Sequence, residues 1–445
     1  MVESNLLELA GFARGEAARL GAQDIACLAT DYSQQLVRFA NNSLTLAANT
    51  REVYLTVYLG VEGRRIVGST SNINRTAVRN FLKSLYRSAR SAAPQEGYVS
   101  LPRGPFEYPR KGEVGGREAD EGVLAEAARA AIDGALESGA SRVAGIISHE
   151  TFSLAISTSG GVEEQDSYSR ALLNVRAFAD SEASGHGLSC AVKLEDLEAD
   201  RAGRTAGHYA RQALNPQSFE EGEYDLLFSH TVAAHFFEHA ITFSSAWYVE
   251  AGISFLAEQL EKQVAAEAVT IEEGGTVEGG LQQRVFDDEG YPARWKIVVE
   301  KGILKTYLHN TTTSKKFQTE STGNAGFITP HPWNIIVNPG DSSWEEMVRE
   351  MRRGFIVTNN WYTRFQNYRR GEFSTVPRDA AFYVENGQIK HPVTGLRVSG
   401  TIPDLLRGIR LMSRDTKWVK WWEVDTPTKS PAALVSGLRV TKAYG

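Results

Sequence analysis

The 445-residue sequence lacks the features that are typical of disulfide-rich, membrane-spanning or secreted proteins. It has two cysteines, Cys27 and Cys190, far apart, which provide neither a disulfide framework nor a CxxC metal site and suit a reducing compartment. It has no run of about 18 apolar residues, so no membrane-spanning helix is expected. The N-terminus carries acidic residues early and no continuous apolar core, which is not the pattern of a signal peptide. We therefore expect a cytoplasmic protein.

An excess of one charge is also missing. The net charge is −6 and the acidic and basic residues are interspersed, so no basic stripe predicts a nucleic-acid partner. Hydrophobic residues make up 42% of the chain and charged residues 23%, which is typical of a soluble globular protein. The chain is too long for one ordinary core, so two or three domains are expected.

Hydrophobic patterning predicts an α+β fold. The first half alternates helices with strand pairs of period-two β-branched and aromatic residues, and Asn41-Asn42 is an expected turn. A helix near residues 194–214 is stopped by Asn215-Pro216. Beyond it, apart from one histidine-bearing helix, the chain is β-rich, with a hairpin turn expected at Asn386-Gly387. We predict an N-terminal α+β domain at residues 1–215 and a C-terminal β-rich domain at residues 216–445.

The histidine-bearing stretch, SHTVAAHFFEHAITF, spans residues 229–243. His235 and His239 are four apart, so on a helix they face the same way and could bind one metal ion. Glu238 completes the string His-x-x-Glu-His, which matches the inverzincin pattern and makes Glu238 a candidate general base. The alternative is that these histidines are partly buried polar residues, hydrogen-bonded to the backbone or to a partner.

A hydrolytic zinc needs more than this helix supplies. It takes three protein ligands, an open position for water and usually a carboxylate as general base. His331 is held on a stiff segment between two prolines and is the candidate for a distant third ligand. Histidines in such segments are, however, more often surface loop residues.

A second candidate site is STGNAGF, at residues 321–327, which lies between two β-rich segments. Its glycines let the backbone approach a ligand closely, so exposed N–H and C=O groups could pair with an extended peptide. The same composition suits a tight connection that needs special backbone angles, and both interpretations stay open. The candidate peptide-binding residues are Thr322, Gly323, Asn324 and Gly326.

Four stretches, in this order, resemble the TldD/PmbA family of modulator-of-gyrase-type metallopeptidases, whose PmbA branch is also called TldE. The resemblance covers nearly the whole chain and implies an α+β N-terminal domain packed against a C-terminal domain of curved, mixed β-sheet. It also implies a cytosolic TldD–TldE pair that encloses a peptidase chamber, degrades unfolded peptides and trims peptide precursors. The stretches are LVRFANNSL with RRIVGSTSN, then ISTSGGVEEQDSYSR, then FDDEGYPARWKIVVEKGILKTYLHNT with STGNAGF, and finally YVENGQIKHPVTGLRVSGTIPDLLRGI.

In this family the TldD-type subunit carries HExxxH on a helix and a further cysteine ligand near its C-terminus. Placing His239 at the second histidine puts Ala234 at the first one and His235 at the glutamate. Anchoring on His230 instead keeps His235 as the second histidine but puts Thr231 at the glutamate. The C-terminal stretch TKWVKWWEVDTPTKSPAALVSGL has no cysteine. The resemblance is therefore to the PmbA/TldE type.

The resemblance implies a catalytically incomplete subunit that binds no cofactor of its own, with zinc held by a TldD-type partner and a peptide or unfolded polypeptide as substrate. Two alternatives remain open. One is a self-sufficient zinc metallopeptidase that uses His235, Glu238 and His239. The other is a non-hydrolytic, peptide-binding homodimer. Neither nucleic acid nor a membrane is expected as a partner.

Overall fold

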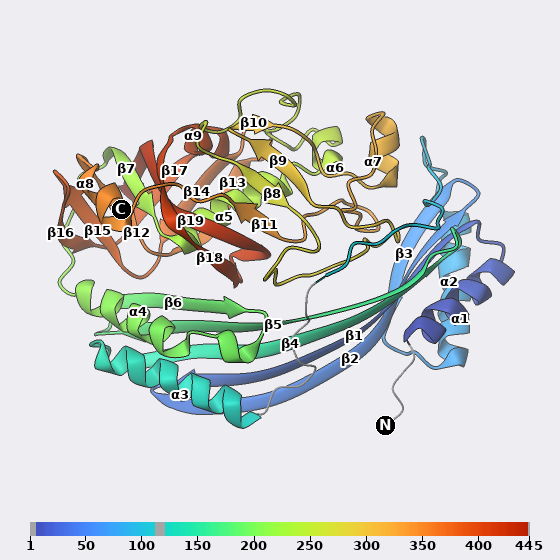
Figure 1. Cartoon of the computed structure of the whole chain (residues 1–445), viewed down its shortest axis with the longest axis horizontal. Coiled ribbons are helices and arrows are strands. Elements are labelled where there is room, and N and C mark those ends of the chain that lie inside the picture. Colours follow the sequence, from blue (N-terminus) through green and yellow to red (C-terminus); the bar gives the residue numbers. More distant parts are fainter. Residues whose placement is uncertain (1–5, 112–120, 444–445) are drawn as a thin grey trace.

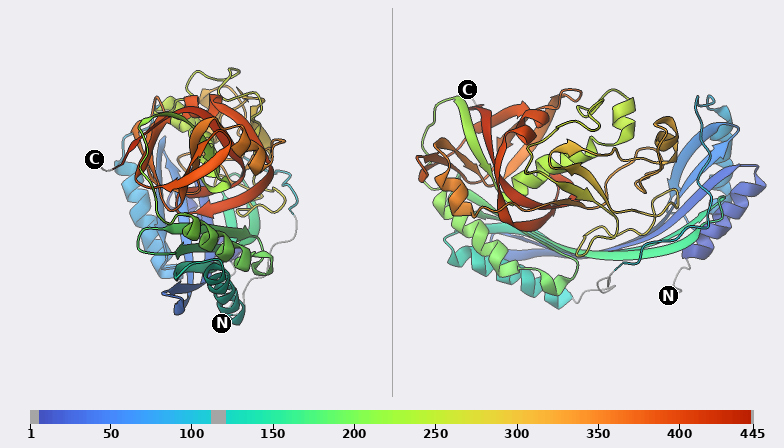
Figure 2. Two further views of the ribbon diagram at one scale, coloured as in Figure 1. Left: turned by 90° about the vertical axis from the view of Figure 1, so that its left-hand side faces the viewer. Right: turned by 45° about the horizontal axis from the view of Figure 1, so that its top comes forward.

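The N-terminal half forms one long antiparallel sheet in the computed structural model, which describes residues 6–111 and 121–443 (Figure 1). The strand order is β3-β2-β1-β4-β5-β6, and the sheet curves along its length into a cradle (Figure 2). Its strands are β1 (Asp24–Ala40), β2 (Ser43–Val61), β3 (Arg64–Thr70), β4 (Arg142–Thr158), β5 (Glu163–Phe178) and β6 (Ser184–Ala191).

Four helices cover the convex face of this sheet: α1 (Leu6–Arg19), α2 (Arg75–Ser91), α3 (Glu121–Glu137) and α4 (Ala199–Gln212). The pair α1 and α2 packs at one end and the pair α3 and α4 at the other, so the face has two separate apolar cores (Figure 1). The helices α3 and α4 lie so close that a Cβ atom added at Gly203 would sit 2.1 Å from the carbonyl oxygen of Ala131. Glycine and alanine at these positions therefore allow the contact.

The C-terminal half is a curved, mixed sheet, in which β7 pairs in parallel with β12, and β11 with β19, among otherwise antiparallel strands. The predicted α+β fold class, with a mixed C-terminal sheet, is confirmed. The strands are β7 (Gly222–Phe228), β8 (Ile271–Glu273), β9 (Lys296–Glu300), β10 (Ile303–Leu304), β11 (Ile335–Val337), β12 (Arg353–Val357), β13 (Asn360–Asn367), β14 (Glu372–Pro377), β15 (Ala381–Glu385), β16 (Gln388–Val393), β17 (Leu396–Thr401), β18 (Ile409–Trp421) and β19 (Val424–Lys442).

Short helices and one longer helix accompany this sheet: α5 (His230–Thr242), α6 (Ala246–Glu250), α7 (Thr311–Lys316), α8 (Trp344–Arg349) and α9 (Ile402–Arg407). The predicted histidine-bearing helix is α5. The helix α4 ends before the predicted domain boundary at residues 215 and 216, and β7 begins after it. That boundary stays a prediction.

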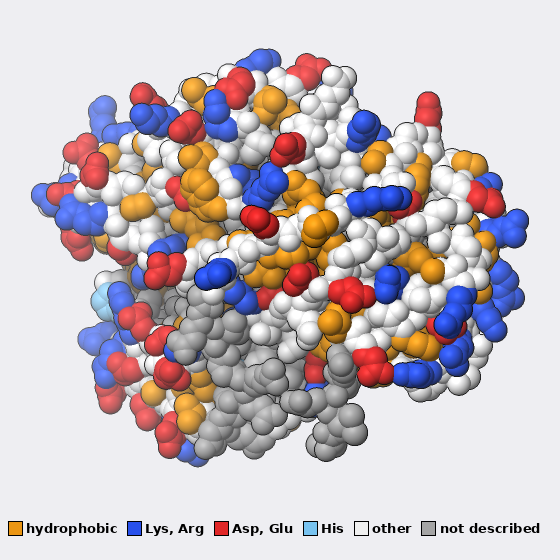
Figure 3. Space-filling model, turned by 45° about the vertical axis from the view of Figure 1, so that its right-hand side comes forward, with side chains coloured by type: hydrophobic (Ala, Val, Ile, Leu, Met, Phe, Trp, Pro, Cys, Tyr) orange, Lys and Arg blue, Asp and Glu red, His pale blue; other side chains and the backbone are white. Residues whose placement is uncertain are grey.

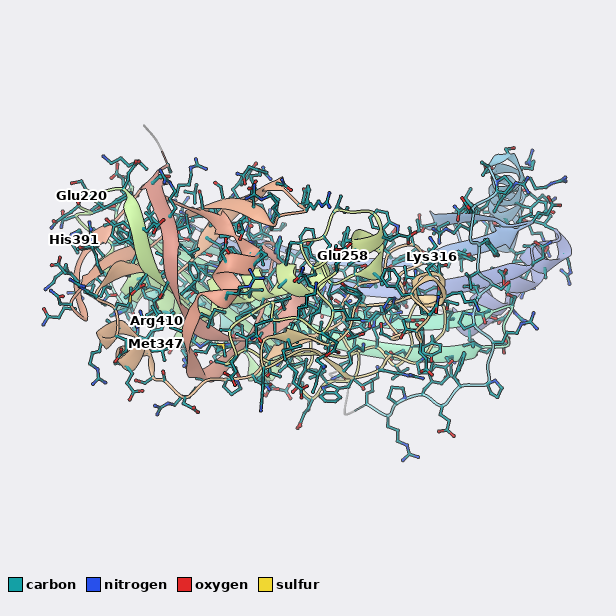
Figure 4. The ribbon with its side chains drawn as sticks, turned by 90° about the horizontal axis from the view of Figure 1, so that it is seen from above. Glu220, Glu258, Lys316, Met347, His391 and Arg410 are labelled. Atoms are coloured by element: carbon teal, nitrogen blue, oxygen red, sulfur yellow. The ribbon has the colours of Figure 1, made fainter. Side chains whose placement is uncertain are left out.

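The C-terminal half sits against the concave face of the N-terminal sheet, as two views show (Figures 1 and 2). Viewed from above, Glu220 and His391 lie at one end of the molecule and Lys316 lies toward the end that carries β3 (Figure 4). An apolar core joins the halves, in which Leu154 and Ile156 of the sheet pack with Phe286 and Phe327. The halves therefore share buried surface.

A buried polar contact also joins the halves. The carboxylate of Asp379 accepts hydrogen bonds from Arg176 Nε at 2.6 Å, Ser184 Oγ at 2.7 Å and Asn359 Nδ2 at 2.9 Å. Arg176 and Ser184 belong to β5 and β6, whereas Asn359 and Asp379 belong to the C-terminal half. Charge-assisted hydrogen bonds of this kind fix the relative position of the two surfaces that carry them.

The surface has charges of both signs interspersed, as the sequence predicts, and Figure 3 shows hydrophobic side chains gathered in a band across the middle of one face. No helix among the described residues is long and apolar enough to cross a membrane.

Candidate functional site

Helix α5 lies inside the C-terminal half. It follows β7 directly and begins after Ser229, whose side chain accepts a hydrogen bond from the backbone N–H of Val232. Nine of its residues, from Val232 to Ile241, are buried, and Phe236 packs against Phe228 and Phe373. A helix that is buried on most sides places its histidines in the core, where imidazoles need internal hydrogen-bond partners.

His235 is almost completely buried, with 1% of its surface exposed. Its Nδ1 lies 2.6 Å from the backbone carbonyl oxygen of Glu423, so Nδ1–H donates to that oxygen. Its Nε2 is buried and has no hydrogen-bond partner among the described residues. Burial, together with the charge of the neighbouring His239, lowers the pKa of His235 to about 3. The ring is therefore neutral at physiological pH.

His239 lies beside His235, with the ring centroids 4.4 Å apart. Its Nδ1 is 2.9 Å from the backbone oxygen of His235 and 3.0 Å from Oε2 of Glu238. Phe365 stacks on the ring at 5.0 Å. Burial by itself would lower the pKa of His239, but the hydrogen bond and charge of Glu238 outweigh it and the pKa is raised.

Glu238 is engaged by its helix neighbours. Its Oε1 accepts a hydrogen bond from the hydroxyl of Thr242 at 3.1 Å, and its Oε2 faces His239. Burial by itself would raise the pKa of Glu238, but the hydrogen bond and charge of His239 outweigh it and the pKa is lowered. The carboxylate therefore pairs with the ring of His239, which is a different arrangement from a base that faces a metal-bound water.

The donor set of α5 meets part of what a metal requires. Both imidazoles have Nδ1 beside a backbone carbonyl oxygen, which orients Nε2 in the manner typical of metal-ligating histidines. A third protein ligand is missing, because no three His, Cys, Asp or Glu side chains in the described part of the chain form a group that could hold a metal ion. A hydrolytic zinc takes three protein ligands, so the described residues do not by themselves fit one.

The structure places His331, the candidate third ligand, in different surroundings. Its Nδ1 lies 3.4 Å from the backbone oxygen of Thr329, and its ring meets that of Trp333 edge-on at 4.5 Å. Burial lowers the pKa of His331. Within the described residues it does not join His235 and His239 in a ligand group.

His230, at the start of α5, also has a separate environment. Its Nε2 lies 3.0 Å from Oδ2 of Asp415 in β18, and burial lowers its pKa to about 4. It lines a cavity of about 280 Å³ between α4, the start of α5 and β18, together with Arg201 and Lys417. The pair His230 and His235, five residues apart in the sequence, thus contacts two different parts of the hairpin β18–β19.

The STGNAGF loop lies inside the C-terminal half, with Gly323, Asn324 and Gly326 buried and Thr322 half-buried. Gly323 has φ +70°, and a Cβ atom there would lie 2.2 Å from the carbonyl oxygen of Pro292. Its own oxygen accepts a hydrogen bond from Trp333 Nε1 at 2.9 Å. These contacts suit the tight connection that the composition allows.

The side chain of Asn324 is part of a buried polar network. It accepts from Lys296 Nζ at 2.7 Å and donates to Glu273 Oε2 at 3.0 Å. Glu273 also accepts from Lys296 at 2.6 Å and from the backbone N–H of Trp333 at 2.7 Å. Peptide pairing by this loop stays a prediction. It would use backbone N–H and C=O groups of the loop that do not take part in this network.

One residue at the site, Glu423, could not be predicted from the sequence. Glu423 holds His235 through its backbone oxygen, and its Oε1 accepts from the backbone N–H of Tyr362 at 3.0 Å. The sequence does indicate a hairpin turn at Trp422-Glu423, because these two residues lie between two β-rich stretches. It does not indicate that this turn contacts His235.

Comparison with known proteins decides the family. Residues 221–442 match the model of the PmbA/TldA metallopeptidase C-terminal domain. A Thermotoga maritima protein, described as a candidate modulator of a DNA gyrase, superposes with a TM-score of 0.85 at 26% identity and covers 98% of this chain and 99% of its own. The chain belongs to the TldD/PmbA family.

Other members of the TldD/PmbA family are similar to it in part or in fold. Metalloprotease PmbA of Escherichia coli O157:H7 is 30% identical over 235 residues, which cover 52% of this chain and 49% of that protein. The PmbA homolog of Buchnera aphidicola is 28% identical over 232 residues, 51% and 50% of the two chains, so the chain spans about half the length of the curated relatives it matches. TldE from Thermococcus kodakarensis shares the fold, with a TM-score of 0.85 at 19% identity over 98% of this chain and 99% of that one.

Proposed function

We propose that this chain is the PmbA/TldE-like, catalytically incomplete subunit of a cytoplasmic TldD/TldE-type zinc metallopeptidase that degrades or trims peptides. The observation that carries the proposal is the donor set of α5. It has two adjacent histidines, no third ligand among the described residues, and a glutamate that is paired with His239. A TldD-type partner would supply the zinc and the general base.

The roles of this chain's own residues in the assembly are structural. His235 connects α5 to the hairpin β18–β19, and the pair Glu238–His239 satisfies two buried polar side chains. The loop that contains Thr322, Gly323, Asn324 and Gly326 remains the proposed place for peptide pairing. The substrate would be an unfolded polypeptide or a peptide precursor bound between the two subunits.

Peptidase activity in reconstituted mixtures tests this proposal. The chain alone should not cleave an unstructured peptide, whereas its mixture with the TldD-type chain of the same genome should. Replacing the HExxxH glutamate of the TldD-type chain should abolish the activity of the mixture, and Glu238→Gln in this chain should leave it measurable. Cleavage by this chain alone, lost in Glu238→Gln, would contradict the proposal.

One observation favours the self-sufficient zinc metallopeptidase as a second candidate. The Nε2 atom of His235 is buried, has no hydrogen-bond partner among the described residues and belongs to a ring that lies beside the ring of His239. Buried polar atoms are rarely left unsatisfied, and a metal ion bound at this nitrogen would satisfy it. The non-hydrolytic homodimer predicts a dimer of this chain alone with no activity in any mixture, which mass measurement and the same assays would reveal.

A further inference from the structure

Exposed aromatic side chains gather where the hairpin β18–β19 meets the start of β13. Trp422, at the hairpin tip, is 56% exposed, and Tyr362 is 54% exposed, whereas the adjacent Trp421 is buried in the core. The ring of Trp361 meets Trp422 edge-on with centroids 4.4 Å apart and stacks with Tyr362 at 6.3 Å. We call Trp361, Tyr362, Arg364, Arg378 and Trp422 the aromatic patch.

The aromatic patch is held rigidly. Tyr362 has φ +61°, a left-handed conformation that is unfavourable for a bulky side chain and that persists only where the surroundings enforce it. Its backbone N–H donates to Oε1 of Glu423 at 3.0 Å. The backbone oxygen of Glu423 in turn accepts from His235, so the patch is fixed to the buried helix α5. Strain maintained in order to present an exposed aromatic ring indicates a function for that ring.

The aromatic patch carries two positive charges, those of Arg364 and Arg378, and the carboxylates of Asp379 and Glu423 act on Arg378 without forming an ion pair with it. The guanidinium of Arg364 lies over the ring of Tyr362, 4.0 Å from its centroid, and that of Arg378 lies over Trp361. Neither forms an ion pair with a carboxylate in the part of the chain that the structure describes, although ion pairs occur elsewhere on the surface. A surface that complements the patch therefore carries carboxylates around an apolar side chain.

We propose that the aromatic patch docks the TldD-type partner subunit, through a segment of that subunit that presents carboxylates to Arg364 and Arg378 and an apolar side chain to Trp422. The proposal rests on the proposed function. Tryptophan, tyrosine and arginine are the residues most enriched among those that dominate binding free energy. A second copy of this chain fits worse, because a two-fold contact centred on the patch would oppose guanidiniums with guanidiniums.

The dissociation constant of the full-length chain with the TldD-type chain of the same genome tests the proposal. Trp422→Ala should raise it at least about 30-fold, since a central tryptophan contributes at hot-spot level. Arg364→Glu should raise it as well, mainly by slowing association, and should reduce its salt dependence. Trp295→Ala is the matched control, because Trp295 is also 56% exposed but lies outside the patch, and it should bind as the wild type does.

The outcomes separate this proposal from the proposed function. If the wild type binds and both patch variants bind equally well, the docking site is elsewhere while the subunit role stands. If the wild type does not bind the TldD-type chain at all, the proposed function fails and the docking proposal fails with it. If the patch variants lose self-association but keep partner binding, a second copy occupies the patch and the assignment is wrong. Unchanged circular dichroism spectra confirm that the variants are folded.

Discussion

His235 and Glu423 are joined by a 2.6 Å hydrogen bond from an imidazole N–H to a backbone carbonyl oxygen, across 188 positions in the sequence. The bond attaches the middle of α5 to the tip of the hairpin β18–β19. It makes Nδ1 of His235 a donor and leaves Nε2 without a partner in the described structure. The histidine that most resembles a metal ligand in the sequence thus has a structural partner of its own.

Replacing His235 by alanine should lower the free energy of unfolding by about 2–4 kcal/mol, because the variant leaves the Glu423 carbonyl unsatisfied and opens a cavity. His235→Asn should recover part of the loss, because an amide can donate to the same oxygen. Urea unfolding measures both variants. Equal stability of His235→Ala and the wild type would show that this bond contributes nothing.

The buried neutral histidines should make the protein less stable in acid. The pKa of His235 is lowered from 6.5 to about 3, so below pH 6.5 the unfolded state binds a proton that the folded state does not, and stability falls as the pH falls. Between pH 6.5 and pH 5, this difference in proton binding lowers the free energy of unfolding by about 2 kcal/mol. Burial lowers the pKa of His186 and of His230 to about 4, and both act in the same direction.

Urea unfolding at pH 6.5 and pH 5 measures this dependence. The free energies of unfolding at pH 6.5 and pH 5 should differ by about 2 kcal/mol less in His235→Asn than in the wild type, because the variant has no titrating group at that position. A difference that is the same in the wild type and in His235→Asn would show that His235 is already exposed or protonated in the folded state.

The pair Glu238–His239 should behave as an ion pair rather than as a base and a ligand. The pKa of His239 is raised, so the stabilisation from its charge is present below pH 6.5 and is lost as the pH rises through the folded value. Glu238→Gln removes the charge that raises this pKa. Titration of the imidazole by NMR should therefore show a lower pKa for His239 in Glu238→Gln, and an unchanged value would contradict the pair.

Two glycines provide a matched test of packing. Gly203→Ala should destabilise the protein by about 1–3 kcal/mol, because its Cβ would sit 2.1 Å from the Ala131 carbonyl oxygen in the neighbouring helix. Gly15→Ala in α1 should instead stabilise it by about 0.5–1 kcal/mol, because nothing lies within 4 Å of the added atom. Thermal unfolding compares the two variants. Equal changes in their unfolding temperatures would argue against the close contact of α3 and α4.

The contact of Asp379 with Arg176 should hold the two halves together. The Asp379 side chain is 1% exposed and that of Arg176 is 30% exposed, so Asp379→Ala should cost about 2–4 kcal/mol, somewhat less than a fully buried pair. Glu137→Ala breaks an exposed pair with Arg204 and should change the stability much less than Asp379→Ala does. Limited proteolysis should cut between the halves sooner in Asp379→Ala only.

Local features of this fold could be predicted from the sequence, because their causes are local. Asn41 and Asn42 both have positive φ in the turn between β1 and β2, as do Asn386 and Gly387 between β15 and β16. Asparagine and glycine tolerate that conformation, so the sequence predicts these turns. The helix that carries His235 and His239 is also predicted from its own residues, because the spacing of its side chains is a local feature.

The partners of the site could not be predicted, because they depend on contacts between distant segments. Spacing places His235 and His239 on one face, but whether His331 reaches them depends on how the loops of the C-terminal half fold. Likewise, the composition of STGNAGF allows either a ligand site or a tight connection, and the close approach of Gly323 to the Pro292 carbonyl oxygen, which suits the connection, depends on a segment about 30 residues away. The deciding neighbours lie far away in the sequence.

The zinc content of the purified chain tests the central claim most directly, and His235→Ala serves as its control. The proposed incomplete subunit predicts no bound zinc in either protein by elemental analysis, because α5 supplies two of the three protein ligands that a hydrolytic zinc takes. About one zinc per wild-type chain, lost in folded His235→Ala, would contradict the account and assign the metal centre to this chain.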